Sequence, residues 1–389
     1  MQVIRDQEPL AQLVERALGA DRLALDLEAS GMFAYRAKIC TAQLAWGSEV
    51  VVVDTLAVPV SGLRALLGAD GPVKIVHDVG FDARLLAEGD VDLGNVHDTA
   101  LAARMLGRAA TGLAALLQSE LGVHIGKEMQ HHDWRVRPLD DRMLTYLATD
   151  VTHLAALEQR LWTEVVDKGI EPEILEETRY RLSTAAASAR APHDEPAYVR
   201  VKGVDRISER EKAVLLVLAE LREREAARRD VPPYKVAPSE ALLAIASARP
   251  TTPAQVARVR GIGTTTAGAR SFVEAVAKAV AAAPERLPEA ERARFDPPRT
   301  PGPVLRARRE RESRLVAWRR AEAKRRGVDE QVVLPGHCVK DAIAAEVDDV
   351  EALARVPGIG AFRIERDGEA MVLALRGTRG GGSGTEETS

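Results

Sequence analysis

The chain has 389 residues, enough for two or three domains, and its 46% hydrophobic and 29% charged residues are ordinary for a globular protein. It shows no apolar run near the ~20 residues of a membrane span, no signal-peptide pattern, and only two distant cysteines, so we expect a cytoplasmic protein without disulfides or membrane contacts. Residues 1–170 hold 24 acidic and 16 basic side chains (net −8), so with −4 overall the remainder carries +4. This asymmetry suggests a catalytic unit tethered to one that holds an anion.

Apolar and alternating patterns predict an α/β organisation for the first 170 residues. A tight turn at Gly47 and Ser48 is expected to join two strands as a hairpin. A long helix is expected to begin after Asp140, its N-cap, and to run to about Asp167. The other elements predicted are strands at 22–28, 38–46, 49–55 and 71–77 and helices after the last strand and at about 99–107 and 111–120.

Beyond residue 206 the pattern is entirely helical and contains an internal repeat. ARVRGIG and ARVPGIG lie 97 residues apart, and five further identical pairs keep this offset without a gap, which implies two copies of one small helical module. The predicted parts are a first domain at 1–170, a linker at 171–206, a first helical module at 207–286, a Pro-rich connector at 287–304, a second helical module at 305–376 and a disordered tail at 377–389.

Two carboxylates end the first predicted strand, in the segment LALDLEASG. Residues i and i+2 of a strand face the same side, so Asp26 and Glu28 repel each other unless a cation intervenes. A solvated strand end is the simpler interpretation, and a divalent metal ion is the functional alternative. Further acids that could complete a metal site are Asp82, on the helix after the fourth strand, and Asp150, one helical turn after Tyr146.

The order of these motifs resembles the DEDD superfamily of 3′→5′ exonucleases, in its tyrosine-bearing branch, and within it the ribonuclease D family. The resemblance rests on D-x-E in the first strand, H-x(4)-D after the fourth, a late Y-x(3)-D helix, and the segments HDTALAARMLG and KEMQHHDWRVRPLDDRMLTYLATDV. The helical repeats resemble tandem HRDC domains, so the likeness covers nearly the whole chain. One departure is Ala29, where many members have an aromatic residue, so Met32, Phe33 or Tyr35 is expected to line the terminal nucleotide.

The resemblance implies an RNase H-like α/β exonuclease domain followed by two all-α HRDC-like domains. It implies a monomeric 3′→5′ exoribonuclease that releases 5′-nucleotides and trims structured RNA such as tRNA precursors. Asp26, Glu28, Asp82 and Asp150 would hold two divalent ions, Mg²⁺ or Mn²⁺. Tyr146, a poor base with an unperturbed pKa near ~10, would orient the attacking water. The alternatives are an exonuclease acting on single-stranded DNA and an inactive nucleic-acid-binding scaffold, and the presence of all four acids and the tyrosine argues against the scaffold.

Further substrate contacts are predicted away from the acids. Trp134 and Arg137 are expected to border the substrate channel, and His77 to make a structural hydrogen bond or, as the less favoured interpretation, an active-site contact. Arginines in the first helix of each repeat are expected to hold the RNA backbone by charge alone. These are Arg222 and Arg229 in the first repeat and Arg319 and Arg326 in the second.

Overall fold

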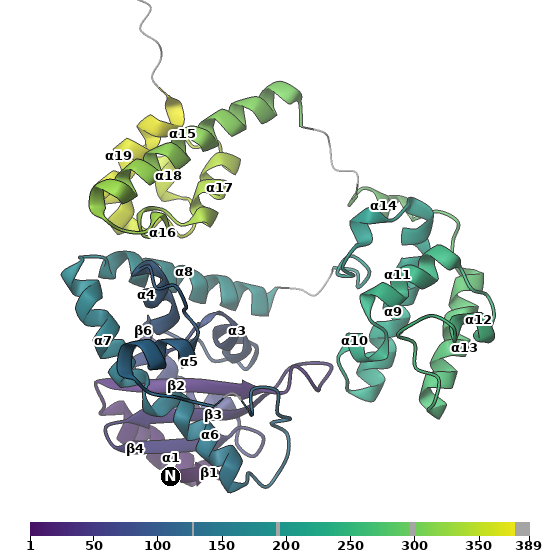
Figure 1. The fold of residues 1–389 in the computed structure, drawn as a ribbon, viewed down its shortest axis with the longest axis horizontal. Coiled ribbons are helices and arrows are strands. Elements are labelled where there is room, and N and C mark those ends of the chain that lie inside the picture. Colours follow the sequence, from purple (N-terminus) through teal and green to yellow (C-terminus); the bar gives the residue numbers. More distant parts are fainter. Residues whose placement is uncertain (127, 192–194, 296–299, 378–389) are drawn as a thin grey trace, which may run out of the picture. The chain divides into compact units, whose positions relative to one another are not determined.

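The computed structural model describes residues 1–126, 128–191, 195–295 and 300–377, which pack as two units (Figure 1). The first unit comprises Met1–Glu28, Ile39–Ala191 and the residues from Thr300 onward. The second comprises Ala29–Lys38 and Pro192–Arg299. Within these described ranges no helix is both long and apolar enough to cross a membrane.

A six-stranded mixed sheet forms the centre of the first unit (Figure 1), with the strand order β1-β4-β3-β2-β5-β6. Its strands are β1 (Gln2–Ile4), β2 (Arg22–Ala29), β3 (Ile39–Trp46), β4 (Glu49–Asp54), β5 (Val73–Val76) and β6 (Val96–Asp98). β2 and β6 both run parallel to β5, whereas β3 and β4 form the predicted antiparallel hairpin. The four predicted strands are confirmed within two residues. β1 and β6 were not predicted, because three residues are too few to show an alternating pattern.

Helices pack around this sheet. They are α1 (Gln7–Leu18), α2 (Arg64–Leu67), α3 (Gly80–Glu88), α4 (Thr99–Met105), α5 (Leu113–Leu116), α6 (Asp141–Thr152), α7 (Leu154–Asp167) and α8 (Glu171–Arg190). Asp140 caps α6 as predicted, because its carboxylate accepts the N–H of Met143 at 2.8 Å. The predicted helix is divided in two at His153, where α6 ends and α7 begins. α6 packs against β3 and β4, which fixes the position of its polar edge.

The linker at 171–206 was expected to include some helix, and the structure shows that its first half is one packed helix. Glu171–Arg190 form α8, a 20-residue helix that packs against α3. Its buried positions include Glu173, Glu176 and Glu177, which we call the α8 carboxylates. Glutamates in a sequence indicate an exposed face, so a helix that buries three of them does not show the apolar stripe by which packed helices are recognised.

The second helical module belongs to the first unit and contacts α8 (Figure 1). It consists of α15 (Gly302–Arg326), α16 (Glu330–Val333), α17 (Gly336–Ala344), α18 (Val350–Ala354) and α19 (Ala361–Arg376). Arg363 is completely buried and donates to the Glu176 carboxylate at 3.3 Å and to the carbonyl oxygen of Glu173 at 3.2 Å. The Glu173 carboxylate accepts from Arg326 and Arg366. The contact between this module and α8 therefore includes buried ion pairs, beside an apolar part in which Val332 packs with Ile174.

A second contact extends this interface. The His337 ring stacks on Tyr180 with centroids 3.9 Å apart, and its Nε2 lies 3.0 Å from the Glu177 carboxylate. Arg181 also donates to Glu177 at 3.1 Å. Burial raises the pKa of Glu177, but these hydrogen bonds outweigh it and the pKa is lowered. Each of the α8 carboxylates thus has a cationic or imidazole partner.

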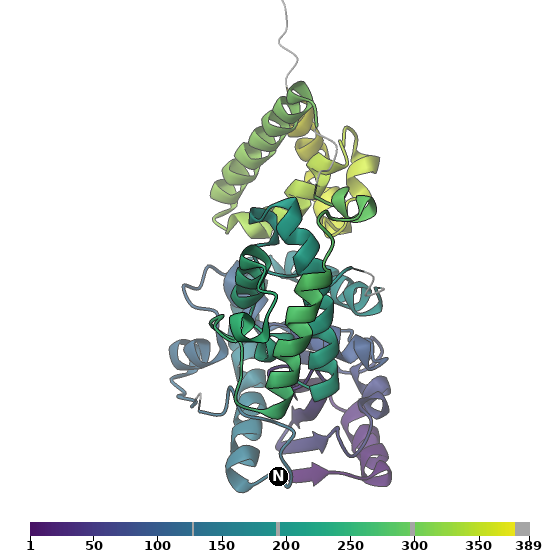
Figure 2. The same cartoon turned by 90° about the vertical axis from the view of Figure 1, so that its right-hand side faces the viewer.

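The first helical module forms most of the second unit. Its helices are α9 (Glu209–Arg229), α10 (Pro233–Val236), α11 (Ser239–Ala248), α12 (Pro253–Val256), α13 (Ala267–Ala282) and α14 (Glu289–Arg292), the last within the predicted connector. α9 and α13 pack side by side, as the long teal and green helices of Figure 2 show. Gly261 and the equivalent Gly358 of the second module have φ of 92° and 82°, which explains the glycine that both repeats share. The predicted tail, beyond Gly377, lies outside the described residues.

Candidate active site

Three of the predicted acids meet at the end of β2. Asp26 and Glu28 leave the same face of the strand, while Leu25 and Leu27 are buried on the other. Asp150 reaches them from α6, and one carboxylate oxygen from each of the three lies within 4.8 Å of the others. The structure therefore brings together side chains that are more than 120 residues apart in sequence, as a site formed by a strand and a crossing helix requires.

The fourth acid, Asp82, comes from the first turn of α3 and is 9% exposed. Its charge raises the pKa of both Asp26 and Glu28, so it lies close enough to act on them, although it is not one of the three within 4.8 Å. The start of α3 is held by Asp98, whose buried carboxylate accepts the backbone N–H groups of Asp78 and Val79. Asp98 thereby fixes the helix end that carries Asp82.

The same Asp98 carboxylate also caps α4, by accepting the N–H groups of Ala100 and Leu101 at 3.0 Å each. No role was predicted for it from the sequence. The available signal was Asp-Thr just before an apolar helical pattern, which is typical of an N-cap. That the same carboxylate also holds a second helix could not be inferred from local sequence.

The pKa of each of the four acids is raised. Burial, followed by the charge of the neighbouring acids, raises the pKa of Glu28 to about 8 and that of Asp82 to about 7. Burial alone raises the pKa of Asp150 to about 7, and burial with the three other acids raises that of Asp26 well above its usual value. The charges acting on these shifts are all carboxylates. A site with crowded carboxylate oxygens and uncompensated negative charge fits hard divalent cations.

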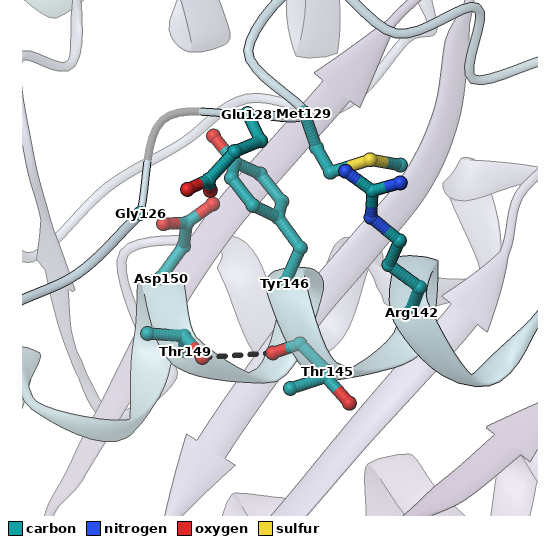
Figure 3. Close-up of a pocket in the computed structure, with 8 residues that line it drawn as sticks. All are labelled: Gly126, Glu128, Met129, Arg142, Thr145, Tyr146, Thr149 and Asp150. Atoms are coloured by element: carbon teal, nitrogen blue, oxygen red, sulfur yellow. Dashed lines mark hydrogen bonds between the residues drawn. The ribbon is translucent and has the colours of Figure 1, made fainter.

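Tyr146 lies one turn before Asp150 on α6 and is half-buried. Burial first, and then the charges of Asp150 and Glu28, raise its pKa well above the ordinary value. The phenol therefore stays protonated at neutral pH, so it can donate a hydrogen bond but cannot accept a proton as a base. Beside it lies a pocket of about 360 Å³ (Figure 3).

Arg137 was predicted to contact substrate. In the structure its hydrogen bonds connect the polar loop before α6 to the sheet. Its guanidinium donates to both oxygens of Asp54 at 2.7 Å and to the carbonyl oxygens of Cys40, Trp134 and Val136. These contacts use all five N–H groups of the side chain. None is left for RNA, and the residue holds the loop against β3 and β4.

Trp134 lies beneath the acids and does not form a channel wall. It is 1% exposed, and its ring centroid is 5.7 Å from that of Tyr146. The indole N–H favours the charged form of Glu28 and lowers its pKa, against the larger effect of burial. Its Nε1 has no partner of full hydrogen-bond geometry among the described residues, so in this structure the interaction with Glu28 is a weak one.

His77 makes the structural hydrogen bond that the sequence favoured. The Thr99 hydroxyl donates to the carbonyl oxygen of Val76 at 3.0 Å, so it accepts from His77 Nδ1, 2.9 Å away. Burial lowers the pKa of His77, which keeps the ring neutral. The residue links the end of β5 to the start of α4.

The segment after Glu28 belongs to the second unit, where its side chains contact the first helical module. The Tyr35 hydroxyl donates to Glu223 at 3.1 Å, and the Lys235 ammonium lies 4.5 Å from the centre of the Phe33 ring. Met32 is 47% exposed. A role for Met32, Phe33 or Tyr35 beside the terminal nucleotide remains a prediction.

The four arginines predicted to hold RNA already have protein partners. Their guanidinium groups turn toward carboxylates, of which only Glu173, the partner of Arg326, is distant in sequence. Arg222 is buried beside Glu223, Arg229 donates to Glu225 and to the carbonyl oxygen of Gly268, Arg319 donates to Glu330, and Arg326 donates to Glu173. A phosphate contact by these four side chains therefore requires that existing pairs open, and it remains an untested prediction.

Comparison with known protein families supports the kinds of domain that the motifs predicted. The family model for 3′–5′ exonucleases matches residues 1–166. The model for the HRDC domain matches twice, at residues 211–279 and 308–375. The second match falls on the module that contacts α8.

Solved structures with this fold include Escherichia coli RNase D, described as an exoribonuclease involved in structured RNA processing. It superposes with a TM-score of 0.67 and 22% identity, covering 96% of this chain and 98% of that one. A protein from Bifidobacterium adolescentis gives a TM-score of 0.76 at 21% identity, with 97% of each chain covered. At these identities the likeness establishes the fold.

Sequence relatives establish the family. Ribonuclease D of Zymomonas mobilis is 31% identical over 302 residues, which are 74% of this chain and 75% of that protein. Ribonuclease D of Gluconacetobacter diazotrophicus is 32% identical over 312 residues, 78% of this chain and 77% of that protein. With a mixed-sheet exonuclease fold, three clustered acids and two HRDC matches, the chain belongs to the ribonuclease D family of 3′→5′ exoribonucleases.

Proposed function

We propose that this exoribonuclease uses two divalent ions, Mg²⁺ or Mn²⁺, to release 5′-nucleotides from the 3′ ends of structured RNA such as tRNA precursors. The observation that carries the proposal is the group of Asp26, Glu28 and Asp150 oxygens within 4.8 Å, with Asp82 adjacent and every pKa raised. The RNA substrate is supported by the ribonuclease D relatives and by the description of the E. coli protein.

Each side chain has a role that follows from its environment. The four carboxylates would hold the ions and place the scissile phosphate between them. Bound ions of this kind lower the pKa of a coordinated water and stabilise the departing 3′-oxygen. Tyr146, kept protonated by its surroundings, donates its hydroxyl hydrogen bond to orient the attacking water or a phosphate oxygen. Trp134 and Arg137 support this arrangement from behind, through Glu28 and the loop.

The test compares substrates and metals with one purified protein. A 3′-extended tRNA and a DNA strand of matched sequence are incubated with Mg²⁺, with Mn²⁺ and with EDTA, and the released nucleotides are identified by chromatography. We expect 5′-nucleotides from the tRNA with either metal and none with EDTA. Release of 3′-nucleotides, or hydrolysis that continues in EDTA, would exclude the two-ion mechanism. Faster hydrolysis of DNA than of RNA would exclude the substrate.

A further inference from the structure

The pocket beside the acids has one cationic wall. Its eight lining residues are Gly126, Glu128, Met129, Arg142, Thr145, Tyr146, Thr149 and Asp150, and Arg142 is the only cation among them. Figure 3 shows the Arg142 guanidinium next to Met129, at the end of the pocket opposite Asp150, whereas the Glu128 carboxylate lies near Tyr146 and Asp150. The pocket therefore has a negative end at the catalytic acids and a positive end at Arg142.

Arg142 lies on the same side of α6 as Tyr146 and Asp150. Arg142, Tyr146 and Asp150 are spaced by four residues, so they follow one stripe of the helix, each step rising about 6 Å along the axis. The Arg142 side chain is exposed and makes no hydrogen bond or ion pair within the part of the chain that the structure describes. It differs in this from Arg137, whose donors are all in use.

The neighbouring polar groups do not offer a comparable contact. The Thr145 hydroxyl donates to the Asp141 carbonyl oxygen and the Thr149 hydroxyl to that of Thr145, so both hydrogens are committed to the helix. The domain is acidic overall, with a net charge of −8 over residues 1–170. Among the described residues that line this pocket, Arg142 is thus the one charged donor that a polyanion meets.

The polarity of the substrate limits which of its phosphates can reach Arg142. A 3′→5′ exonuclease cuts the last phosphodiester, and the terminal nucleotide ends in a hydroxyl, so every other phosphate lies upstream of the scissile one. We propose that Arg142 binds the phosphate immediately upstream of the scissile phosphate, which makes this pocket the subsite for the penultimate nucleotide. The inference rests on the proposed position of the scissile phosphate at the four acids.

The test removes one charge from the protein and one from the RNA. Two hexa-adenylates each carry a single neutral methylphosphonate, one at the first linkage upstream of the scissile phosphate and the other at the third. A third hexa-adenylate keeps all its phosphates and is called unmodified. The 2′-hydroxyls next to both positions are methylated in all three. The initial rate of release of the terminal nucleotide is measured over a range of RNA concentrations for the wild-type enzyme and for Arg142→Gln. Arg104→Gln, which changes an exposed arginine on α4, is the matched control.

Arg142→Gln is expected to lower kcat/KM for the unmodified RNA roughly ten-fold, the scale of one charge-assisted hydrogen bond, mainly through KM. The first-linkage methylphosphonate should cost the wild type a similar factor and cost Arg142→Gln little more. At the third linkage, wild type and variant should lose equally. Arg142→Lys should recover part of the loss, and Arg104→Gln should behave as wild type.

Two results would overturn the inference. One is an unchanged kcat/KM in Arg142→Gln, and the other is a full and additive loss when the first-linkage charge is removed from that variant. Both leave the proposed metal site intact, because that site is tested separately by Asp150→Asn. Equal thermal unfolding of Arg142→Gln and the wild type shows that the comparison is not affected by misfolding.

Discussion

Two groups of buried or half-buried carboxylates lie in the same unit and differ in their partners. The α8 carboxylates face Arg326, Arg363, Arg366 and His337 and are held in ion pairs or hydrogen bonds. Of the four acids proposed to be catalytic, Asp26, Glu28 and Asp150 face one another at the end of β2 and Asp82 lies nearby, and the pKa of each is raised. Burial of acidic side chains alone therefore does not indicate a functional site. The presence or absence of a cationic partner separates the acidic group that joins α8 to the second helical module from the group that we propose to bind metal ions.

The largest effect expected from this comparison is on catalysis. Asp150→Asn removes one ligand charge, so hydrolysis of RNA in Mg²⁺ should become undetectable. In EDTA the variant should be at least as stable as wild type, because one repelling charge is gone. Product release and thermal unfolding measure the two quantities. Appreciable turnover, or a clear loss of stability, would make this group resemble the α8 carboxylates and break the comparison.

The reverse result is expected on the α8 side. Arg363→Met leaves the buried Glu176 without its cation, and breaking a buried pair from one side costs about 3–5 kcal/mol of unfolding free energy. Urea unfolding measures the loss. Glu176→Gln in the same chain removes the uncompensated charge and should restore part of the stability. A single variant as stable as wild type would show that the pair does not fasten the module.

Tyr146→Phe sharpens the comparison within the catalytic group, because it removes a hydroxyl without changing charge. We expect kcat to fall on the order of 10²-fold with KM nearly constant, the pattern for a positioned donor. Steady-state kinetics on a short RNA measures both constants. Metal binding, followed by calorimetry with Mn²⁺, should be unaffected. An unchanged kcat would reduce Tyr146 to a packing residue.

A smaller effect is expected on the pH dependence of stability in EDTA. Asp82 has a pKa of about 7 when folded, against 3.8 for the ordinary carboxyl, so between these values the native state holds a proton that the unfolded chain has lost. Stability from this group therefore falls as pH rises from about 4 to 7 and is constant above. Asp82→Asn, which cannot ionise, should match the stability of wild type near pH 4 and exceed it by on the order of 4 kcal/mol at pH 8.

Thermal unfolding of both proteins at the two pH values provides the measurement. Addition of Mg²⁺ at pH 8 should stabilise the wild type more than Asp82→Asn, because the ion replaces the missing proton. A constant difference across pH would show that Asp82 is not held protonated by its neighbours.

The residues of the acidic cluster could be picked out from the sequence because their signals are local, whereas their catalytic role remains a prediction. Asp26 and Glu28 follow the period of a strand, and Tyr146 and Asp150 follow that of a helix, so each pair needs only neighbouring residues to be recognised. The role of the arginines could not be predicted in the same way. Arg326 pairs with Glu173, 153 residues away, and nothing near either residue indicates the other.

The two repeats illustrate the same limit. Their common offset of 97 residues predicted two copies of one module, and both copies are present. At that offset Arg363 corresponds to Thr266, Arg366 to Ala269 and His337 to Glu240, so the first copy keeps only one of the basic residues that meet α8, Arg229 in place of Arg326. The difference is visible in the sequence, but it acquires meaning only when the glutamates of α8 are known to be buried.

The pairing of Glu176 with Arg363 also imposes an order on synthesis. The two residues are 187 positions apart, so Glu176 leaves the ribosome long before its cation exists. At roughly 5–20 residues per second the interval is on the order of 10–40 s. During that time no arginine of α19 can neutralise the α8 carboxylates, and the nascent exonuclease domain exposes this negatively charged surface. Glu176 can pair with Arg363 only after α19 has emerged.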